Sequence, residues 1–129
     1  MQLKGIGVFA KDMPTMVRFY RDVLEFDIKE TDNTTSVYLI KDGVLFMLYK
    51  RSDFEKMTNQ QYNYTNGFNG HYEIALEVKN YAAVDATYTK VVSKGAIPVM
   101  PPTTEPWGQR TCYISDPEGN LIEIGSFIK

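Results

Sequence analysis

The sequence has one cysteine, one histidine and no long apolar run. It contains one cysteine, Cys112, so no internal disulfide can form, and a lone thiol fits a reducing compartment. No apolar run approaches the ~20 residues of a membrane span, and residues 1–6 do not read as a signal region. These absences predict a soluble cytoplasmic protein, in which we expect Cys112 to be a packed, inert thiol.

The chain also lacks a large excess of either positive or negative charge. The formal net charge is −2, and the chain has neither a basic run nor a basic amphipathic helix. We therefore expect no nucleic-acid partner and no membrane partner. With 129 residues, of which 43% are hydrophobic, the chain is long enough to bury one substantial core, so we predict a single domain over residues 1–129.

The two halves of the chain resemble each other. Leu3–Leu24 aligns without a gap with His71–Val92, and Asp42–Leu45 aligns with Glu118–Leu121. A repeat of this length predicts a core built from two copies of one small unit. The predicted division is a first repeat over 1–49, a linker or lid loop over 50–70, and a second repeat over 71–129.

Strand and helix signals follow the same order in both repeats. In the first, they predict a strand over 3–10, a helix from 12 to 24, and strands over 34–40 and 44–49. In the second, they predict a strand over 72–78, a helix from 80 to 94, a short edge strand over 97–100, and strands over 109–115 and 120–127. Each repeat is interpreted as a βαβββ unit. The fold class is therefore α+β, with eight strands in a curved mixed sheet, two helices on its outer face and a cup on the other.

The linker between the repeats is polar and turn-prone, yet it carries Phe54, Tyr62, Tyr64 and Phe68. Loops of this length inside a compact domain are usually functional or mobile. Two interpretations stay open: a solvated strap that joins the repeats, or an aromatic lid over the cup.

Three motifs carry a resemblance to a known superfamily. They are the strand-to-helix segment Asp12–Phe26, the tetrapeptide Trp107-Gly108-Gln109-Arg110, and the stretch Asp116–Ile124. Together with the repeat, they resemble the vicinal-oxygen-chelate superfamily of glyoxalases, bleomycin-resistance-type proteins and extradiol dioxygenases. The resemblance implies a homodimer that binds a small molecule in its cup.

The resemblance also implies where a metal would be held. The four metal positions of metal-dependent glyoxalases fall here at Gly5, at Met47 (Phe46 if the hairpin shifts by one), at Glu73 and at Glu123, so two carboxylates remain. The only imidazole is His71, two residues before Glu73. A triad of His71, Glu73 and Glu123 is one candidate site for a divalent ion such as Ni²⁺, Zn²⁺, Co²⁺ or Mn²⁺.

Strand alternation assigns faces to these side chains. Apolar residues flank Glu73 and Glu123, so each glutamate is expected to point away from the helices and into the cup. Arg110 could neutralise Glu123 or remain apart from it. The candidate ligand-binding residues are Phe9, Met47, Tyr49, Glu73, Trp107, Arg110, Tyr113 and Glu123.

Three functions follow from these residues. The first hypothesis is a metal-free binder of a small molecule in an acidic, aromatic-lined cup, with no cofactor. The alternative is a metal-dependent glyoxalase-like lyase or isomerase, in which Glu123 is ligand or base, Glu73 a second ligand and His71 a third. A third possibility is metal-free catalysis with Glu73 or Glu123 as general base.

Overall fold

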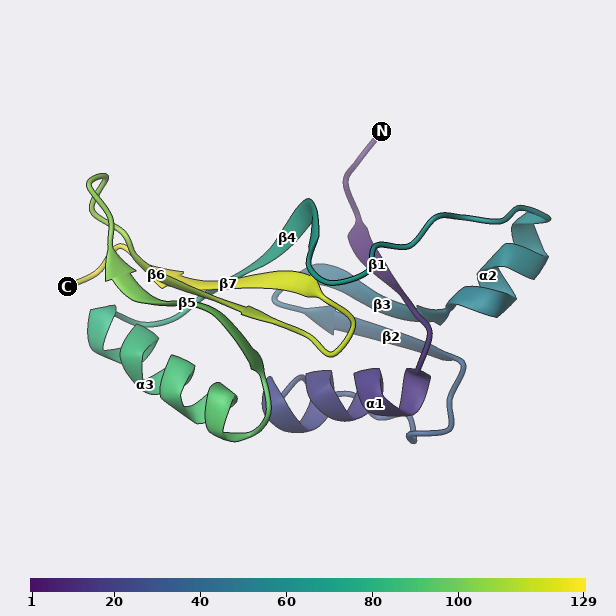
Figure 1. Ribbon diagram of the computed structural model, residues 1–129, viewed down its shortest axis with the longest axis horizontal. Coiled ribbons are helices and arrows are strands. Elements are labelled where there is room, and N and C mark those ends of the chain that lie inside the picture. The colour runs from purple at the N-terminus through teal and green to yellow at the C-terminus, as the bar shows by residue number, and fades with distance from the viewer. The chain divides into compact units, whose positions relative to one another are not determined.

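The computed structural model describes residues 1–129, which divide into two compact units, residues 1–64 and residues 65–129. Each unit contains one sheet (Figure 1). None of the helices combines the length and the apolar character needed to cross a membrane. The α+β fold class with tandem βαβββ-type units is confirmed.

The first unit consists of a three-stranded sheet and its helices. Its elements are β1 (Gly5–Ala10), α1 (Met13–Arg18), the π-helical turn η1 (Phe19–Val23), β2 (Ser36–Lys41), β3 (Val44–Lys50) and α2 (Arg51–Thr58). The strand order is β1-β3-β2, with β1 parallel and β2 antiparallel to β3.

Helix α1 begins where the sequence predicts it. Oδ1 of Asp12 accepts a hydrogen bond from the backbone N–H of Thr15 at 3.2 Å, and Pro14 stands in the first turn. The buried stripe of α1 and η1 consists of Met13, Met16, Val17, Phe19 and Tyr20. Tyr20 is fully buried, and its ring centroid lies 4.9 Å from that of Phe46 in β3. The apolar spacing of this segment therefore builds the core of the first unit.

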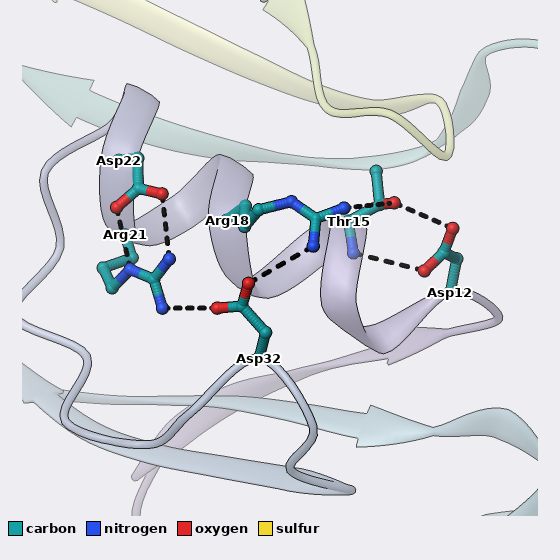
Figure 2. A network of polar contacts seen from close by, with 6 residues as sticks. All are labelled: Asp12, Thr15, Arg18, Arg21, Asp22 and Asp32. Carbon is teal, nitrogen blue, oxygen red and sulfur yellow. Dashed lines mark hydrogen bonds and ion pairs between the residues drawn. The ribbon is translucent and has the colours of Figure 1, made fainter.

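A polar network covers the outer surface of the same helix. Figure 2 shows its members, which are Asp12, Thr15, Arg18, Arg21, Asp22 and Asp32. Asp32 accepts from Arg21 at 2.6 Å and from Arg18 at 3.2 Å, and the hydrogen bond from Arg21 lowers the pKa of Asp32 from its ordinary value. The network ties the segment before β2 to the helix. Because all these groups are partly exposed, each pair is expected to add little stability.

The second unit contains one complete βαβββ repeat. Its elements are β4 (Asn69–Glu77), α3 (Tyr81–Ser93), β5 (Ile97–Thr104), β6 (Arg110–Ser115) and β7 (Asn120–Ser126), in the sheet order β4-β7-β6-β5. Figure 1 shows α3 lying along one face of this sheet, where it contacts β5, β6 and β7. Helix α3 begins where the sequence predicts it, and Asn80 caps it by accepting from the N–H of Ala83 at 3.0 Å. Gly95 follows the helix end with a φ of 110°.

The first unit has one strand fewer than predicted, so the chain has seven strands rather than eight. The missing strand would follow η1. There, Glu25 has a left-handed φ of 60°, and the N–H of Ile28 bonds to the carbonyl of Phe26 at 2.8 Å. An extended strand cannot make such a tight turn, so these residues run as coil into β2.

Two other segments also differ from the sequence prediction. The linker was expected to be a loop, but it begins with α2, whose Phe54 stacks on Phe9 at 4.1 Å between ring centroids. The edge strand predicted to stop at residue 100 continues as β5 to Thr104 through Pro101 and Pro102. Proline is tolerated there because β5 is an edge strand with two register shifts in its pairing with β6.

Cys112 in β6 is expected to be unreactive in the folded protein. Its side chain is fully buried, and burial raises the pKa of the thiol to about 11. Because the thiolate is the reactive form, a thiol reagent should label the native protein far more slowly at neutral pH than a free thiol. The measurement is the labelling rate with a disulfide reagent, compared with the same protein in guanidinium. Equal rates in the two conditions would contradict it.

Candidate functional site

The strand registers confirm the internal repeat and identify equivalent positions. Met47 pairs with Tyr38 in the first sheet, and Glu123 pairs with Tyr113 in the second. Phe46 is buried in the core of its unit. Met47, rather than Phe46, is therefore the first-unit equivalent of Glu123.

Two donors hold the carboxylate of Glu123. Nε2 of Gln109 donates to one oxygen at 2.9 Å, and the hydroxyl of Tyr113 donates to the other at 2.8 Å. The indole N–H of Trp107 donates in turn to Oε1 of Gln109 at 3.0 Å. Glu123 is half-buried on the sheet face opposite α3, and these bonds fix its orientation there.

Tyr113 lies near two carboxylates. Burial, and then the hydrogen bonds and negative charges of Glu123 and Glu73, raise the pKa of the Tyr113 hydroxyl. Tyr113 therefore keeps its proton throughout the physiological range and acts as a donor. Glu73 itself is exposed on β4, on the same face as Glu123 as strand alternation predicts.

A shallow pocket of about 180 Å³ opens beside Glu123. It is lined by Ala75, Leu76, Glu77, Gln109, Glu123, Gly125, Ser126 and Phe127. A methyl group on Gly125 would lie 2.8 Å from Nε2 of Gln109 and 3.3 Å from Oε1 of Glu123. The absence of a side chain at residue 125 thus leaves the space in which Gln109 reaches Glu123.

Arg110 does not join this group of side chains. Its guanidinium forms an ion pair with Asp85 of α3 at 2.7 Å and donates to Thr104 at 2.9 Å. Arg110 follows Gln109 directly, so alternation turns it to the helix-covered face. The neutralisation of Glu123 by Arg110 that the sequence left open does not occur within this unit.

The other predicted aromatic residues lie in the first unit. Phe9, Met47 and Tyr49 share the sheet face opposite to the buried residues Val8 and Leu48. The hydroxyls of Tyr38 and Tyr49 hydrogen-bond to each other, and the ring centroids of Phe9 and Tyr49 are 6.5 Å apart. The structure thus groups the predicted residues into an apolar, phenolic face on the first unit and an acidic face on the second.

Gln109, Gly125 and Tyr38 are not among the site residues predicted from the sequence, although two of them had a signal there. Gln109 is four residues before Tyr113 and therefore has the same strand parity, which predicts a shared face. Tyr38 aligns with Tyr113 in the repeat. Gly125 had no such signal, because its role depends on where the Gln109 side chain runs.

The comparisons with known proteins agree with this architecture. A family model described as Glyoxalase/Bleomycin resistance protein/Dioxygenase superfamily matches residues 2–124. The chain belongs to this superfamily. No curated protein matches the chain.

Solved structures of other glyoxalase-superfamily proteins have the same fold. A family enzyme from Burkholderia phytofirmans is 21% identical with a TM-score of 0.83, covering 99% of this chain and 100% of that one. A glyoxalase-related enzyme from Fulvimarina pelagi is 18% identical with a TM-score of 0.82, covering 96% and 86%. Lactoylglutathione lyase from Agrobacterium tumefaciens is 21% identical with a TM-score of 0.73, covering 96% and 92%.

The retained acidic residues of this glyoxalase-superfamily chain do not form a three-ligand metal group. No three His, Cys, Asp or Glu side chains converge in a way that could hold an ion. The β4–β7 pairing shifts register between Asn69 and Glu73, so regular strand alternation does not fix how His71 is oriented relative to Glu73. The candidate triad of His71, Glu73 and Glu123 is therefore not assembled in the structure.

The position equivalent to Glu73 in the first unit cannot take a side chain without rearrangement. A methyl group on Gly5 would overlap the carbonyl oxygen of Leu45 and lie 2.7 Å from its Cβ atom. Strands β1 and β3 are therefore too close at this point for a metal-ligating residue. Of the four positions that the resemblance implies, Gly5 is excluded by backbone packing and Met47 by side-chain chemistry.

Proposed function

We propose that this chain is a small-molecule-binding protein of the glyoxalase superfamily that recognises its ligand at Glu123 without a bound metal and without a chemical step. The observation that carries the proposal is the orientation of Glu123 by Gln109 and Tyr113 at the wall of a pocket. An oriented carboxylate is a ready acceptor for a ligand that brings hydrogen-bond donors.

The charge around the pocket supports a ligand that donates hydrogen bonds or carries positive charge. Glu77 also lines the pocket, and Glu73 lies on the same face of the sheet. The guanidinium of Arg110 is turned to the other face, where Asp85 neutralises it. An anionic ligand would be repelled by the negative charges of Glu77 and Glu123, whereas an amine would be attracted.

Aromatic surface near the pocket supports an organic ligand rather than a bare ion. Phe127 lines the pocket, and Trp107 is hydrogen-bonded to Gln109; both side chains are more than half exposed. Exposed rings of this kind lose water favourably when a planar or cationic molecule stacks on them.

We further propose that the protein is a homodimer and works in the cytoplasm. The superfamily resemblance supports the first proposal, and the lone reduced cysteine supports the second. Light scattering of the purified protein tests the dimer, and a monomeric mass would contradict it.

The test of binding uses the only tryptophan as the signal. A panel of aromatic amines and aromatic carboxylates is titrated into the protein while Trp107 fluorescence is recorded. We expect amines to bind and Glu123→Gln to weaken them about tenfold, because the amide replaces one acceptor oxygen with a donor. Glu105→Gln, which makes the same change in the neighbouring turn, should bind as the wild type does.

Metal analysis separates this function from the lyase alternative. The protein is dialysed against limiting Mn²⁺, Co²⁺, Ni²⁺ and Zn²⁺, and its metal content and hemithioacetal turnover are measured. We expect no stoichiometric retention and no turnover with any of the four ions. One tightly held ion per chain together with turnover would contradict the binding function and support a glyoxalase-like lyase.

A further inference from the structure

Gln109 connects two side chains that have no direct contact with each other. Its Nε2 donates to Glu123 at 2.9 Å, and its Oε1 accepts from the indole N–H of Trp107 at 3.0 Å. A carboxylate only accepts and an indole N–H only donates. One orientation of the amide satisfies both bonds, and the reverse orientation satisfies neither.

The space for this amide depends on Gly125. A Cβ atom there would lie 2.8 Å from Nε2 of Gln109, closer than non-bonded atoms approach, and 3.3 Å from Oγ1 of Thr111. The amide therefore lies directly over the backbone of β7. An alanine at residue 125 would displace the amide from Glu123 while leaving the chemistry of Gln109 unchanged.

We propose that Gln109 is a positioning residue of the Glu123 site, which fixes the carboxylate and couples it to Trp107, and that Gly125 provides the space for this coupling. The coupling is a property of the unliganded protein. Its consequence for affinity rests on the proposed function. Gln109 and Tyr113 each donate one hydrogen bond to Glu123. The oriented carboxylate can therefore act only as a hydrogen-bond acceptor for a ligand.

The coupling is tested without any ligand. The chain has one tryptophan, so the indole N–H gives a single side-chain peak in a ¹H–¹⁵N correlation spectrum. We expect Gln109→Leu and Gly125→Ala each to shift this peak beyond its line width and to speed its exchange with solvent. Gly70→Ala is the matched control, since a methyl group at Gly70 meets nothing within 4 Å.

The possible outcomes of this spectroscopic experiment are distinct. A shift in both variants, but not in Gly70→Ala, supports the coupling, because the three atoms nearest to a methyl group at residue 125 belong to Gln109, Glu123 and Thr111 and none belongs to Trp107. An indole peak that stays in place in both variants would overturn it. Circular dichroism of each variant checks that the fold is retained. If one variant does not fold, the other still tests the coupling.

Affinity is then measured with benzylamine and benzoate as probes. We expect benzylamine to bind the wild type and to lose about tenfold in affinity in Gln109→Leu and in Gly125→Ala, while benzoate binds none of them. Equal benzylamine affinity in wild type and variants would overturn the positioning role. If neither probe binds the wild type while the indole peak responds as expected, the proposed function fails and the coupling stands.

Discussion

Gly5→Ala is expected to lower the free energy of unfolding by about 3 kcal/mol, at the upper end of the range for overpacking substitutions. The added methyl group would overlap the carbonyl oxygen of Leu45 and approach its Cβ atom to 2.7 Å. Because the obstacle includes backbone of the paired strand β3, no side-chain rotation can relieve it, and β1 must move away. Urea unfolding followed by circular dichroism measures the loss.

Gly7→Ala is the matched control, in the same strand and on the same face. A methyl group there would lie 3.7 Å from the flexible end of Met47, which is an ordinary contact. We expect a change below about 1 kcal/mol, since Gly→Ala in an extended strand also reduces the entropy of the unfolded chain. Equal losses in the two variants would contradict the close approach of β1 and β3.

The same packing has a consequence for metal binding. Metal-dependent glyoxalases, which the sequence resembles, carry a histidine at the position of Gly5 and a glutamate at that of Met47, and Gly5→His together with Met47→Glu would introduce both. We expect this double variant to be at least as unstable as Gly5→Ala and to gain no stoichiometric Ni²⁺. The backbone spacing at Gly5 therefore opposes a metal-ligating side chain there, whichever residue is substituted.

Asp116→Ala is expected to cost about 3–5 kcal/mol, because several buried donors lose their acceptor and each unsatisfied donor costs about 1–3 kcal/mol. Asp116 is fully buried in the turn between β6 and β7. Its carboxylate accepts from the backbone N–H groups of Glu118 and Asn120 at 2.9 and 3.0 Å, and from the side-chain amide of Asn120 at 2.8 Å. Its removal leaves three donors without their partner in a place that water does not reach.

The effect of Asp116→Ala should extend to the start of β4. The side-chain oxygen of Asn120 accepts from Asn69 at 3.2 Å and from the hydroxyl of Tyr72 at 3.1 Å, so this amide joins the turn to β4. Hydrogen exchange of the amides around Tyr72 should therefore accelerate together with those of the turn. Protection that changes only in the turn would contradict the connection.

Asp27→Ala provides the control for loss of a carboxylate. Asp27 pairs with Lys29 at 2.7 Å, but both side chains are more than three-quarters exposed. An exposed pair contributes at most about 1 kcal/mol. A loss from Asp116→Ala no larger than from Asp27→Ala would show that the buried network is not what stabilises the turn.

Much of the fold could be predicted from local signals in the sequence. The two long helical segments begin at the predicted positions, where Asp12 and Asn80 cap them, because capping needs only an acceptor beside the first free N–H groups. Asp42-Gly43 forms a tight turn between the two strands predicted over 34–40 and 44–49, with φ values of 50° and 80°. No local signal indicated that the first unit would lack a strand after η1. The turn at Phe26 and Ile28 takes the place of that strand, and this turn depends on contacts with the helix.

The candidate site was only partly predictable. Alternation correctly placed Glu73, Tyr113 and Glu123 on one face, because strand periodicity is independent of the rest of the fold. His71 had the right spacing, but the register shift after Asn69 interrupts the alternation.

The sequence by itself determined the repeat, the superfamily and the identity of the acidic face, since all three depend on residue type and spacing along the chain. The tertiary structure decided which partners those residues have. Gln109 reaches Glu123 because Gly125 leaves the space, whereas Arg110, the next residue, is held by Asp85 on the other face. Which side chains become partners depends on the distances between strands and helices that are remote in sequence. No local sequence pattern encodes those distances.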